Sequence, residues 1–303
     1  MEYLLKTKDL KKTYFGKPAV NKINIDIKKG DIYGFIGKNG AGKTTTMKMI
    51  VGLERPSSGE IELFENKNLN EGRSKLGTVI EYPCLYPYMT ARQNVEAQRY
   101  LLNVKDKSVV DDVLEIVGLS DTGNKKAKNF SLGMKQRLAI ALSLVGNPEF
   151  LMLDEPINGL DPMGIKDIRD LILTLNRERG ITIMMSSHIL GELVKISTRF
   201  GIINKGELVD QFDYDELKER VKEKITIRVN DTIRAYDILK NEVKIENCII
   251  DGDRSISIFD HLEDSGVITA ALANNDVILE SINKDGGDYE SYFIKLMGGN
   301  KND

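Results

Sequence analysis

The fold of this chain is decided by one short stretch, Gly37-Lys38-Asn39-Gly40-Ala41-Gly42-Lys43-Thr44. It matches the pattern G-x-x-x-x-G-K-[ST], in which successive backbone N–H groups of a glycine-rich loop point inward and bind phosphate oxygens. The apolar run Asp31–Ile36 precedes it and predicts a strand, and a helical pattern follows from Lys43 to about Gly52. That helix adds the positive end of its dipole to the loop. A plain glycine-rich turn, the alternative, does not require this strand–loop–helix context, so the stretch predicts a phosphate-binding site.

Each side chain of this loop has an expected task at a nucleoside triphosphate. We expect Lys43 to reach the β- and γ-phosphates and the Thr44 hydroxyl to hold Mg²⁺. Glycine is needed where the chain approaches phosphate closely or adopts a positive φ, and Thr45 is expected to donate to the α-phosphate. The expected nucleotide-binding residues of the loop are Gly37, Asn39, Gly40, Ala41, Gly42, Lys43, Thr44 and Thr45.

A second stretch, Phe150–Glu155, is an apolar run that ends in two acids. A buried parallel strand delivers the residues at its carboxyl end to the edge of the sheet where α/β proteins bind ligands. We expect Asp154 to support Mg²⁺, and Glu155, which points elsewhere, to polarise a water molecule for attack on the γ-phosphate. Acids often follow strands, so the pair alone is weak evidence. Together with the phosphate loop it predicts hydrolysis.

Further apolar runs, at Ile181–Met185 and Phe200–Ile203, predict buried strands between helical stretches. Strands that alternate with helices indicate an α/β domain with a mostly parallel sheet. After about Lys205 the pattern changes to short alternating strands and helices, which indicates a smaller α+β domain. We therefore expect a nucleotide-binding α/β domain over residues 1–215 and an accessory α+β domain over residues 216–303.

The composition excludes several classes of protein. The hydrophobic fraction of 41% is too high for a disordered chain, and a net charge of −3 argues against a general nucleic-acid binder, which carries a basic excess. No run approaches the roughly 18 apolar residues that a membrane-spanning helix requires. A partner would therefore have to bring this chain to a membrane. The two cysteines, Cys84 and Cys248, are far apart in sequence and are expected to be reduced thiols in a cytosolic protein.

Further motifs lie before and after the acid pair. The segment Phe130–Arg137 reads FSLGMKQR, Asn158–Asp161 reads NGLD, Ser186–His188 reads SSH, and Tyr14 precedes the phosphate loop. In this order, together with the phosphate loop and the acid pair, they resemble the ABC ATPase family of P-loop NTPases. The resemblance covers about residues 1–215, and it implies that the nucleotide is ATP.

The resemblance implies a role for each motif. Ser131 and Gly133, in the family's signature motif, contact the ATP that is bound to a second copy, and Asp161 lies in the loop after the acid pair. His188 contacts the γ-phosphate, and Tyr14 stacks on adenine. Two copies thus enclose two ATP molecules, each between one phosphate loop and the opposite signature motif. ATP holds the two copies together, and hydrolysis releases them.

The residues alone leave simpler alternatives for three of these positions. Phe15 competes with Tyr14 for the adenine ring, and Tyr14 is then an ordinary strand aromatic. For His188 the alternative is a buried, hydrogen-bonded histidine, but its place directly after an apolar strand favours the γ-phosphate role. Ser131 is a good N-cap and need only begin a helix, although a helix N-terminus at this point also presents N–H groups to phosphate.

Two departures from the family pattern narrow the resemblance. Glu81 lies where the family usually has a glutamine that senses the γ-phosphate. A carboxylate ligates Mg²⁺ or water but has no N–H to donate, and its charge is unfavourable beside phosphate unless a metal or cation offsets it. In the signature motif Leu132 replaces a glycine, and Met134–Lys135 replaces glycine–glutamine. The expected catalytic residues are Glu155, His188 and Glu81, and the expected metal ligands are Thr44, Glu81 and Asp154.

Both departures, and the tail Tyr289–Gly299, resemble the bacitracin- and lantibiotic-resistance branch of ABC exporters. The resemblance implies an ATPase subunit that docks on a separate membrane permease at the cytoplasmic face of the cell membrane. An apolar and aromatic loop, Glu81–Thr90, is the expected permease contact, with a local loop core as the alternative. Its apolar residues are Tyr82, Pro83, Leu85, Tyr86, Pro87 and Tyr88.

Two other functions compete with export. ABC proteins that act on ribosomes or nucleic acid share these nucleotide motifs, but they typically carry two ATPase units or a long coiled-coil insertion. This chain has one phosphate loop and no heptad run. A ligand-sensing C-terminal domain is the third hypothesis, and residues 225–303 contain no recognisable site. The expected partners are therefore ATP, a permease and a second copy of the chain, without nucleic acid.

Overall fold

The computed structural model describes residues 2–81, 84–286 and 288–298, and these form two compact units. The first unit runs to Tyr214 and takes in the segment from Phe293, and the second is Asp215–Tyr292. The expected division at residue 215 instead assigned the whole tail to the C-terminal domain. Phe293 belongs to the first unit because its ring is buried in an aromatic cluster there. Its centroid lies 5.8 Å from that of Phe200 and 6.3 Å from that of Phe212.

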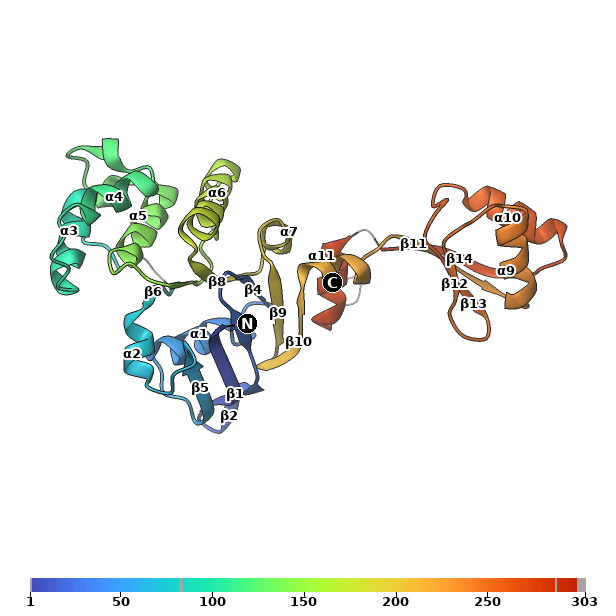
Figure 1. The fold of residues 1–303 in the computed structure, drawn as a ribbon, viewed down its shortest axis with the longest axis horizontal. Helices are drawn as coiled ribbons and strands as arrows, with labels where there is room; N and C mark the ends of the chain where they lie inside the picture. Colours follow the sequence, from blue (N-terminus) through green and yellow to red (C-terminus); the bar gives the residue numbers. More distant parts are fainter. Residues whose placement is uncertain (1, 82–83, 287, 299–303) are drawn as a thin grey trace. The chain divides into compact units, whose positions relative to one another are not determined.

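A six-stranded sheet forms the centre of the first unit (Figure 1). From edge to edge its strands are β10 (Glu207–Asp213), β9 (Arg199–Asn204), β4 (Ile32–Ile36), β8 (Thr182–Ser187), β7 (Phe150–Leu153) and β6 (Leu76–Val79). All neighbours pair in parallel except β10, which closes one edge antiparallel to β9. Every residue of β4, β7 and β8 is buried, as continuous apolar runs predict. The α/β class with a mostly parallel sheet is confirmed.

An antiparallel sheet packs beside it in the same unit. Its strands are β2 (Lys17–Ile23), β1 (Tyr3–Tyr14) and β3 (Asp26–Lys28), and β5 (Ser58–Leu63) also pairs with β1. One apolar core joins this sheet to β4 and to helix α1 (Lys43–Val51). Strand β5 was not predicted from the sequence, because it begins with three exposed residues and lacks the alternation of a half-buried strand.

Helices cover the central sheet and extend to one side as a separate group (Figure 1). Three of them, α3 (Ala91–Leu101), α4 (Val109–Ile116) and α5 (Leu132–Leu144), pack on one another. Helix α3 ends near Asn103, whose φ of 54° is left-handed. The others in this unit are α2 (Leu69–Ser74), α6 (Pro162–Arg179) and α7 (Leu190–Val194), with short 3-10 turns at Ser120–Thr122 and Ala127–Asn129.

The second unit is a small sheet with two helices. Its elements follow the chain as β11 (Lys224–Val229), α9 (Thr232–Asn241), β12 (Cys248–Ile250), β13 (Ser255–Ile258), α10 (Ser265–Asn274) and β14 (Leu279–Asp285). The sheet is antiparallel in the order β12-β13-β11-β14, which is the split βαβ arrangement of ferredoxin-like folds. Alternate residues of β11, Ile225, Ile227 and Val229, enter its core.

Two further helices complete the chain. Helix α8 (Tyr214–Arg220) precedes the second sheet, and helix α11 (Tyr289–Leu296) follows it. Among the helices of the described residues, none has the length and apolar character that would let it cross a lipid bilayer.

Candidate nucleotide site

The phosphate loop joins β4 to α1 and lines a cavity of about 200 Å³. Gly40 and Gly42 have φ angles of 78° and 111°, a region in which side chains are disfavoured. Gly37 has no room for a side chain, because a Cβ there would lie 2.5 Å from the carbonyl oxygen of Ile203. The cavity is lined by Ala19, Lys38, Asn39, Gly40, Ala41, Gly42, Lys43, Thr44, Thr45 and Glu155. The structure thus brings Glu155 to the phosphate loop.

Lys43 connects the loop to the acid pair. Its ammonium is buried, donates to the carbonyl oxygen of Gly37 over 2.6 Å and lies 3.1 Å from Glu155 Oε1. The other oxygen of Glu155 lies 2.8 Å from His188 Nδ1. Lysine, glutamate and histidine therefore form one chain of contacts across the cavity, and this arrangement puts the imidazole beside the expected base.

Asp154 is held by two hydroxyl groups. Thr44 Oγ1 donates to Asp154 Oδ2 over 2.7 Å, and Ser186 Oγ donates to Asp154 Oδ1 over 2.5 Å. Ser186 Oγ also accepts from the backbone N–H of Glu155 over 2.9 Å. Ser186 had no predicted role of its own. Its signal was its place near the end of β8, one residue beyond the β7–β8 pair Leu153–Met185, which sets it beside Asp154.

The oxygen atoms of Thr44 and Asp154 fit a small, hard cation such as Mg²⁺. In proteins Mg²⁺ is commonly held by one or two side-chain oxygens together with substrate phosphates and water, and not by a cage of protein ligands. The described residues contain no group of three or more His, Cys, Asp and Glu side chains that could hold a metal ion.

Glu81 lies apart from these two oxygen ligands. It follows β6 by two residues, its φ is 63°, and its Oε1 lies 2.6 Å from the ammonium of Lys48 on α1. Its described side-chain contact is this ion pair, and Thr44 and Asp154 contact each other instead. The expected grouping of Glu81 with the metal ligands is therefore not seen as a direct contact.

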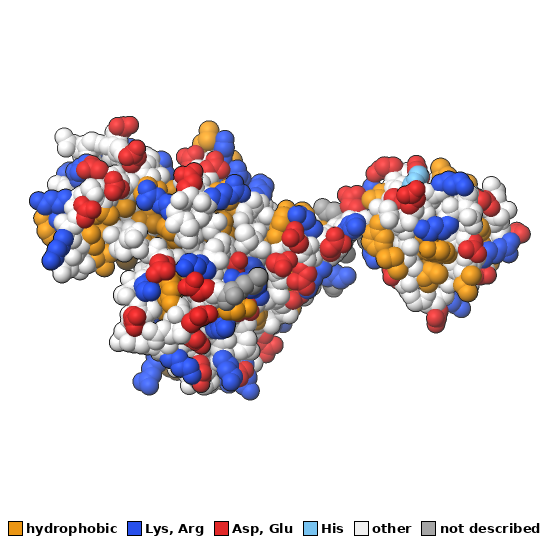
Figure 2. Space-filling view, viewed as in Figure 1, with side chains coloured by type: hydrophobic (Ala, Val, Ile, Leu, Met, Phe, Trp, Pro, Cys, Tyr) orange, Lys and Arg blue, Asp and Glu red, His pale blue; other side chains and the backbone are white. Residues whose placement is uncertain are grey.

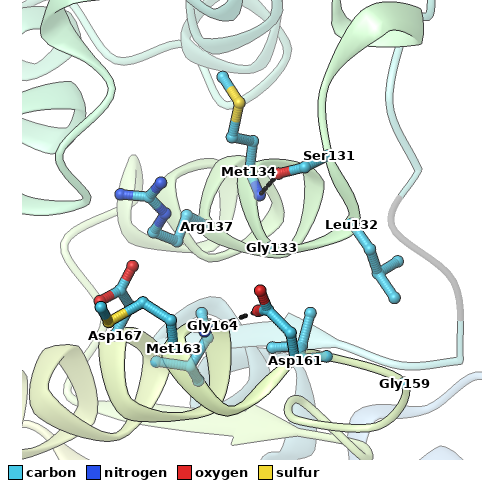
Figure 3. Close-up of a pocket in the computed structure, with 12 residues that line it drawn as sticks. Ser131, Leu132, Gly133, Met134, Arg137, Gly159, Asp161, Met163, Gly164 and Asp167 are labelled. Atoms are coloured by element: carbon cyan, nitrogen blue, oxygen red, sulfur yellow. Dashed lines mark hydrogen bonds between the residues drawn. The ribbon is translucent and has the colours of Figure 1, made fainter.

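The signature segment builds a second cavity, of about 310 Å³, between the beginnings of α5 and α6 (Figure 3). Ser131 caps α5 by accepting from Met134 N over 3.2 Å, and Asp161 caps α6 by accepting from Gly164 N over 2.9 Å. No residue lines both this second cavity and the phosphate-loop cavity. Within one chain, Ser131, Gly133 and Asp161 therefore lie together but do not line the cavity of the phosphate loop.

Leu132, the residue that departs from the glycine pattern, reaches across this second cavity. Its side chain projects from the start of α5 toward the loop before α6 (Figure 3). A Cβ built on Gly159 would lie 3.3 Å from Leu132 Cδ2, and Gly159 has a φ of 74°. The leucine thus packs directly on the loop that follows the acid pair.

Tyr14, at the end of β1, does not line either of these cavities. Its ring is 38% exposed, and the ammonium of Lys12 lies 4.9 Å from the ring centroid. Lys12 also pairs with Glu54 and lowers the pKa of that carboxyl, with a smaller contribution from a hydrogen bond to Tyr14. Phe15 follows in the turn with its side chain fully exposed. Both aromatic rings are therefore accessible.

Comparison with known proteins identifies the family. A family model described as ABC transporter matches residues 20–158. Over 302 residues, 99% of both chains, this sequence is 42% identical to the bacitracin transport ATP-binding protein BcrA of Bacillus licheniformis. The chain belongs to the ABC transporter ATP-binding proteins. The P-loop character and the recognition of the family by its motifs are thereby confirmed.

Two further relatives of this ABC protein each match 70% of its length. The lantibiotic transport ATP-binding protein SrtF of Streptococcus pyogenes is 42% identical over 213 residues, 70% of this chain and 92% of its own. A solved dimeric ATP-binding cassette in a post-hydrolysis state, bound to ADP and Pi, is 27% identical with a TM-score of 0.64. That match covers 70% of this chain and 99% of the cassette. As a member of this family, the chain is an ATP-binding and ATP-hydrolysing subunit of an ABC transporter.

Proposed function

We propose that two copies of this chain close around two molecules of Mg·ATP and drive a separate membrane permease that exports an antimicrobial peptide or another hydrophobic compound. One observation carries the first part: each chain holds a phosphate-loop cavity and a signature cavity with no shared lining. A second copy, facing the first, supplies the missing half of each ATP site. The similarity to BcrA over 99% of both chains supports the cargo class.

The phosphate loop grips the triphosphate through its backbone N–H groups and Lys43. Lys43 exchanges Glu155 for the β- and γ-phosphates, because phosphate oxygens carry more negative charge than one carboxylate. Thr44 and Asp154 would hold Mg²⁺, which would supply positive charge to offset that of the triphosphate. Thr45 donates to the α-phosphate, and the ring of Tyr14 stacks on adenine.

Glu155 is the general base of hydrolysis in this proposal. Its carboxylate lines the cavity next to the phosphate loop, and it is released from Lys43 when the lysine turns to phosphate. His188 then holds Glu155 in place through the contact of 2.8 Å and faces the γ-phosphate. A free carboxylate at this position accepts a proton from the attacking water.

The signature cavity closes the site from the opposite copy. Ser131 and the backbone N–H of Gly133 stand at the start of α5, where the helix dipole favours an anion. They contact the γ-phosphate that is held by the other copy, and Asp161 lies beside them at the start of α6. Because hydrolysis removes the γ-phosphate, it removes the anion that holds the two copies together.

The permease contact lies in the loop that begins at Glu81. Tyr86 and Tyr88 are 48% and 74% exposed, so they do not form a closed local core. Tyr82 and Pro83, which belong to the same expected contact, lie outside the described residues. In Figure 2 hydrophobic side chains also gather over the end of the first unit that holds α3 and α5. The permease thus holds this chain at the cytoplasmic face of the membrane.

The proposal is tested by giving the chain and its candidate permease to a susceptible bacterium. We expect raised resistance to bacitracin or to a lantibiotic, and co-purification of the two proteins from membranes. The Lys43→Ala variant is the matched control, and we expect it to co-purify without conferring resistance. Unchanged susceptibility to both compounds, despite co-purification, would argue against the cargo class. Absence of co-purification would argue against the permease.

A further inference from the structure

Two glutamates occupy equivalent positions at the ends of neighbouring strands. Strands β6 and β7 pair in parallel with Val79 opposite Leu153, and the backbone N–H of Asp154 extends the pairing to Val79 O over 2.8 Å. Glu81 and Glu155 each follow two residues after these paired ends. Both have left-handed backbones, with φ angles of 63° and 51°. Such conformations are disfavoured for residues with a side chain and persist only where the surroundings hold them.

Each of these carboxylates is held by a lysine of helix α1. Glu155 pairs with Lys43 at 3.1 Å, and Glu81 pairs with Lys48 at 2.6 Å. Lys48 lies four residues after Thr44, so it stands one turn further along the helix face that meets Asp154. The two strand ends and the one helix therefore form two parallel lysine–glutamate pairs.

The two pairs differ in their surroundings. The side chains of Lys43 and Glu155 are 5% and 20% exposed, whereas those of Lys48 and Glu81 are 28% and 51% exposed. Lys43 is committed to phosphate once a nucleotide binds, but Lys48 lies beyond the loop and does not line its cavity. Lys48 is thus able to stay with Glu81 while the triphosphate is bound.

A carboxylate at this strand end faces a simple electrostatic difficulty. Glu155, which follows the neighbouring strand β7, lines the cavity proposed to receive the triphosphate. A second carboxylate nearby is unfavourable, because it repels the negatively charged phosphates in a partly desolvated site. An amide side chain at the same place would not have this effect. The ammonium of Lys48, which lies 2.6 Å from Glu81 Oε1, supplies a positive charge that offsets this carboxylate.

We infer that Lys48 is a positioning residue for Glu81: its ammonium holds the carboxylate over α1 and cancels its charge, so that the loop carries a glutamate beside the triphosphate without repelling it. This inference rests on the proposed placement of Mg·ATP at the phosphate loop. It makes a specific demand, which is that Lys48 matters for nucleotide affinity only while residue 81 is a glutamate.

The test is a double-mutant cycle on the full chain with Lys48→Met, Glu81→Gln and both together. We measure the Kd of Mg·ATP and of Mg·ADP by titration. With Glu81 unchanged, we expect Lys48→Met to weaken Mg·ATP binding about tenfold, and Mg·ADP binding less, because the γ-phosphate carries the additional charge. In the Glu81→Gln background the same substitution should change neither Kd. Lys48→Arg should keep the affinity of the unsubstituted chain.

The control is a second lysine–glutamate pair at the opposite ends of the same strands. Lys75 and Glu149 lie 3.2 Å apart, just before β6 and β7, and are similarly exposed. Lys75→Met should leave both Kd values unchanged, and thermal unfolding of every variant checks the fold. If Lys48→Met weakens ATP equally in both backgrounds, or in neither, the inference is wrong.

The failure of this inference is distinguishable from a failure of the proposed site. Lys43→Ala, measured in the same titration, should weaken Mg·ATP binding by roughly 10²-fold whatever the cycle shows. If that variant binds ATP normally, the proposed nucleotide site is wrong and the inference falls with it. If only the cycle shows no coupling, the nucleotide site stands and Lys48 has no special relation to Glu81.

Discussion

The two cavities of the first unit differ in what they offer a nucleotide. The phosphate-loop cavity adjoins interlocked charged and hydroxyl side chains, with Lys43 on Glu155 and Thr44 on Asp154. The signature cavity offers two helix beginnings capped by their own side chains, and both apolar side chains such as Leu132 and the charged side chains of Arg137 and Asp167 line it (Figure 3). The first is equipped for chemistry and the second for recognising an anion.

This difference explains why one chain alone does not complete the site. A catalytic carboxylate must be held in position by neighbouring side chains. In the first cavity Lys43 and His188 of the same chain hold Glu155. Helix N–H groups need only an anion within hydrogen-bonding reach, which a second copy delivers. Substitutions in the first cavity should therefore change hydrolysis or nucleotide affinity directly. Substitutions in the second should change the association of two copies and leave nucleotide binding by one chain unchanged.

The largest expected effect is on hydrolysis, from Glu155→Gln. The amide keeps the size of the side chain but accepts no proton, so the rate of ATP hydrolysis should fall by about 10²- to 10⁴-fold. ATP affinity should hold or rise, because Lys43 loses its competing carboxylate, and the bound nucleotide should trap a dimer. Steady-state ATPase assays and light scattering with ATP measure both properties. Full turnover by this variant would refute the general-base assignment.

Next in size is the loss of nucleotide affinity in Lys43→Ala. Hydrogen bonds to charged groups contribute about 1.5–3 kcal/mol, so loss of this ammonium should weaken Mg·ATP binding by roughly 10²-fold. Lys38 lines the same cavity on its exposed side, and Lys38→Ala is the matched control, with a much smaller expected change. Equal affinities of the two variants in equilibrium titration would mean that the loop binds ATP without a special lysine.

A variant of the second cavity, Gly133→Asp, should separate recognition from chemistry. A negative charge at the start of α5 is compatible with the helix dipole, so folding should be kept. The same charge should repel the γ-phosphate of the opposite copy and weaken ATP-driven dimerisation at least about tenfold in the Glu155→Gln background.

Gly133→Ala is the neutral control for this prediction, because a Cβ there would meet only Leu160, at 3.9 Å. ATP binding by the monomer should be unchanged in both variants when it is measured below the concentration of dimer formation. If Gly133→Asp dimerised like Gly133→Ala, the signature segment would not face the opposite nucleotide.

The sequence predicted the charged cavity better than its surroundings. Gly37–Thr44 carries its geometry locally, since its positive-φ glycines and the helix at Lys43 are neighbours in the chain. The contact between Ser186 and Asp154 depends on strand pairing between β7 and β8, which no single stretch of sequence reveals. Likewise the pair of Lys48 with Glu81 joins residues 33 positions apart and forms only in the folded chain.

In the accessory unit, too, local sequence predicted the individual elements but not the contacts between distant segments. Its sheet strands alternate clearly in sequence, as in Ile225, Ile227 and Val229, and helix α9 has an Asp231 cap. The order β12-β13-β11-β14 is a property of the assembled sheet and was not predicted. The return of Phe293 to the first unit was missed for the same reason, because its aromatic partners lie about ninety residues earlier in the chain.

The smallest expected effect is on ATP affinity, from substitution of the aromatic residue that stacks on adenine. Tyr14 and Phe15 are adjacent, accessible aromatics outside the lining of the phosphate-loop cavity, so only one is needed to stack on the base. An aromatic stacking contact contributes about 0.5–1.5 kcal/mol, so Tyr14→Ala should weaken ATP binding about two- to tenfold, and Phe15→Ala should not. Tyr14→Phe should keep the affinity, because the ring face makes the contact.

Titration with ATP and with inorganic triphosphate isolates the contribution of the adenine base, since Tyr14→Ala should leave triphosphate binding unaltered. If Phe15→Ala weakens ATP and Tyr14→Ala does not, the adenine lies on the turn residue, and the site begins one residue later in the chain than proposed.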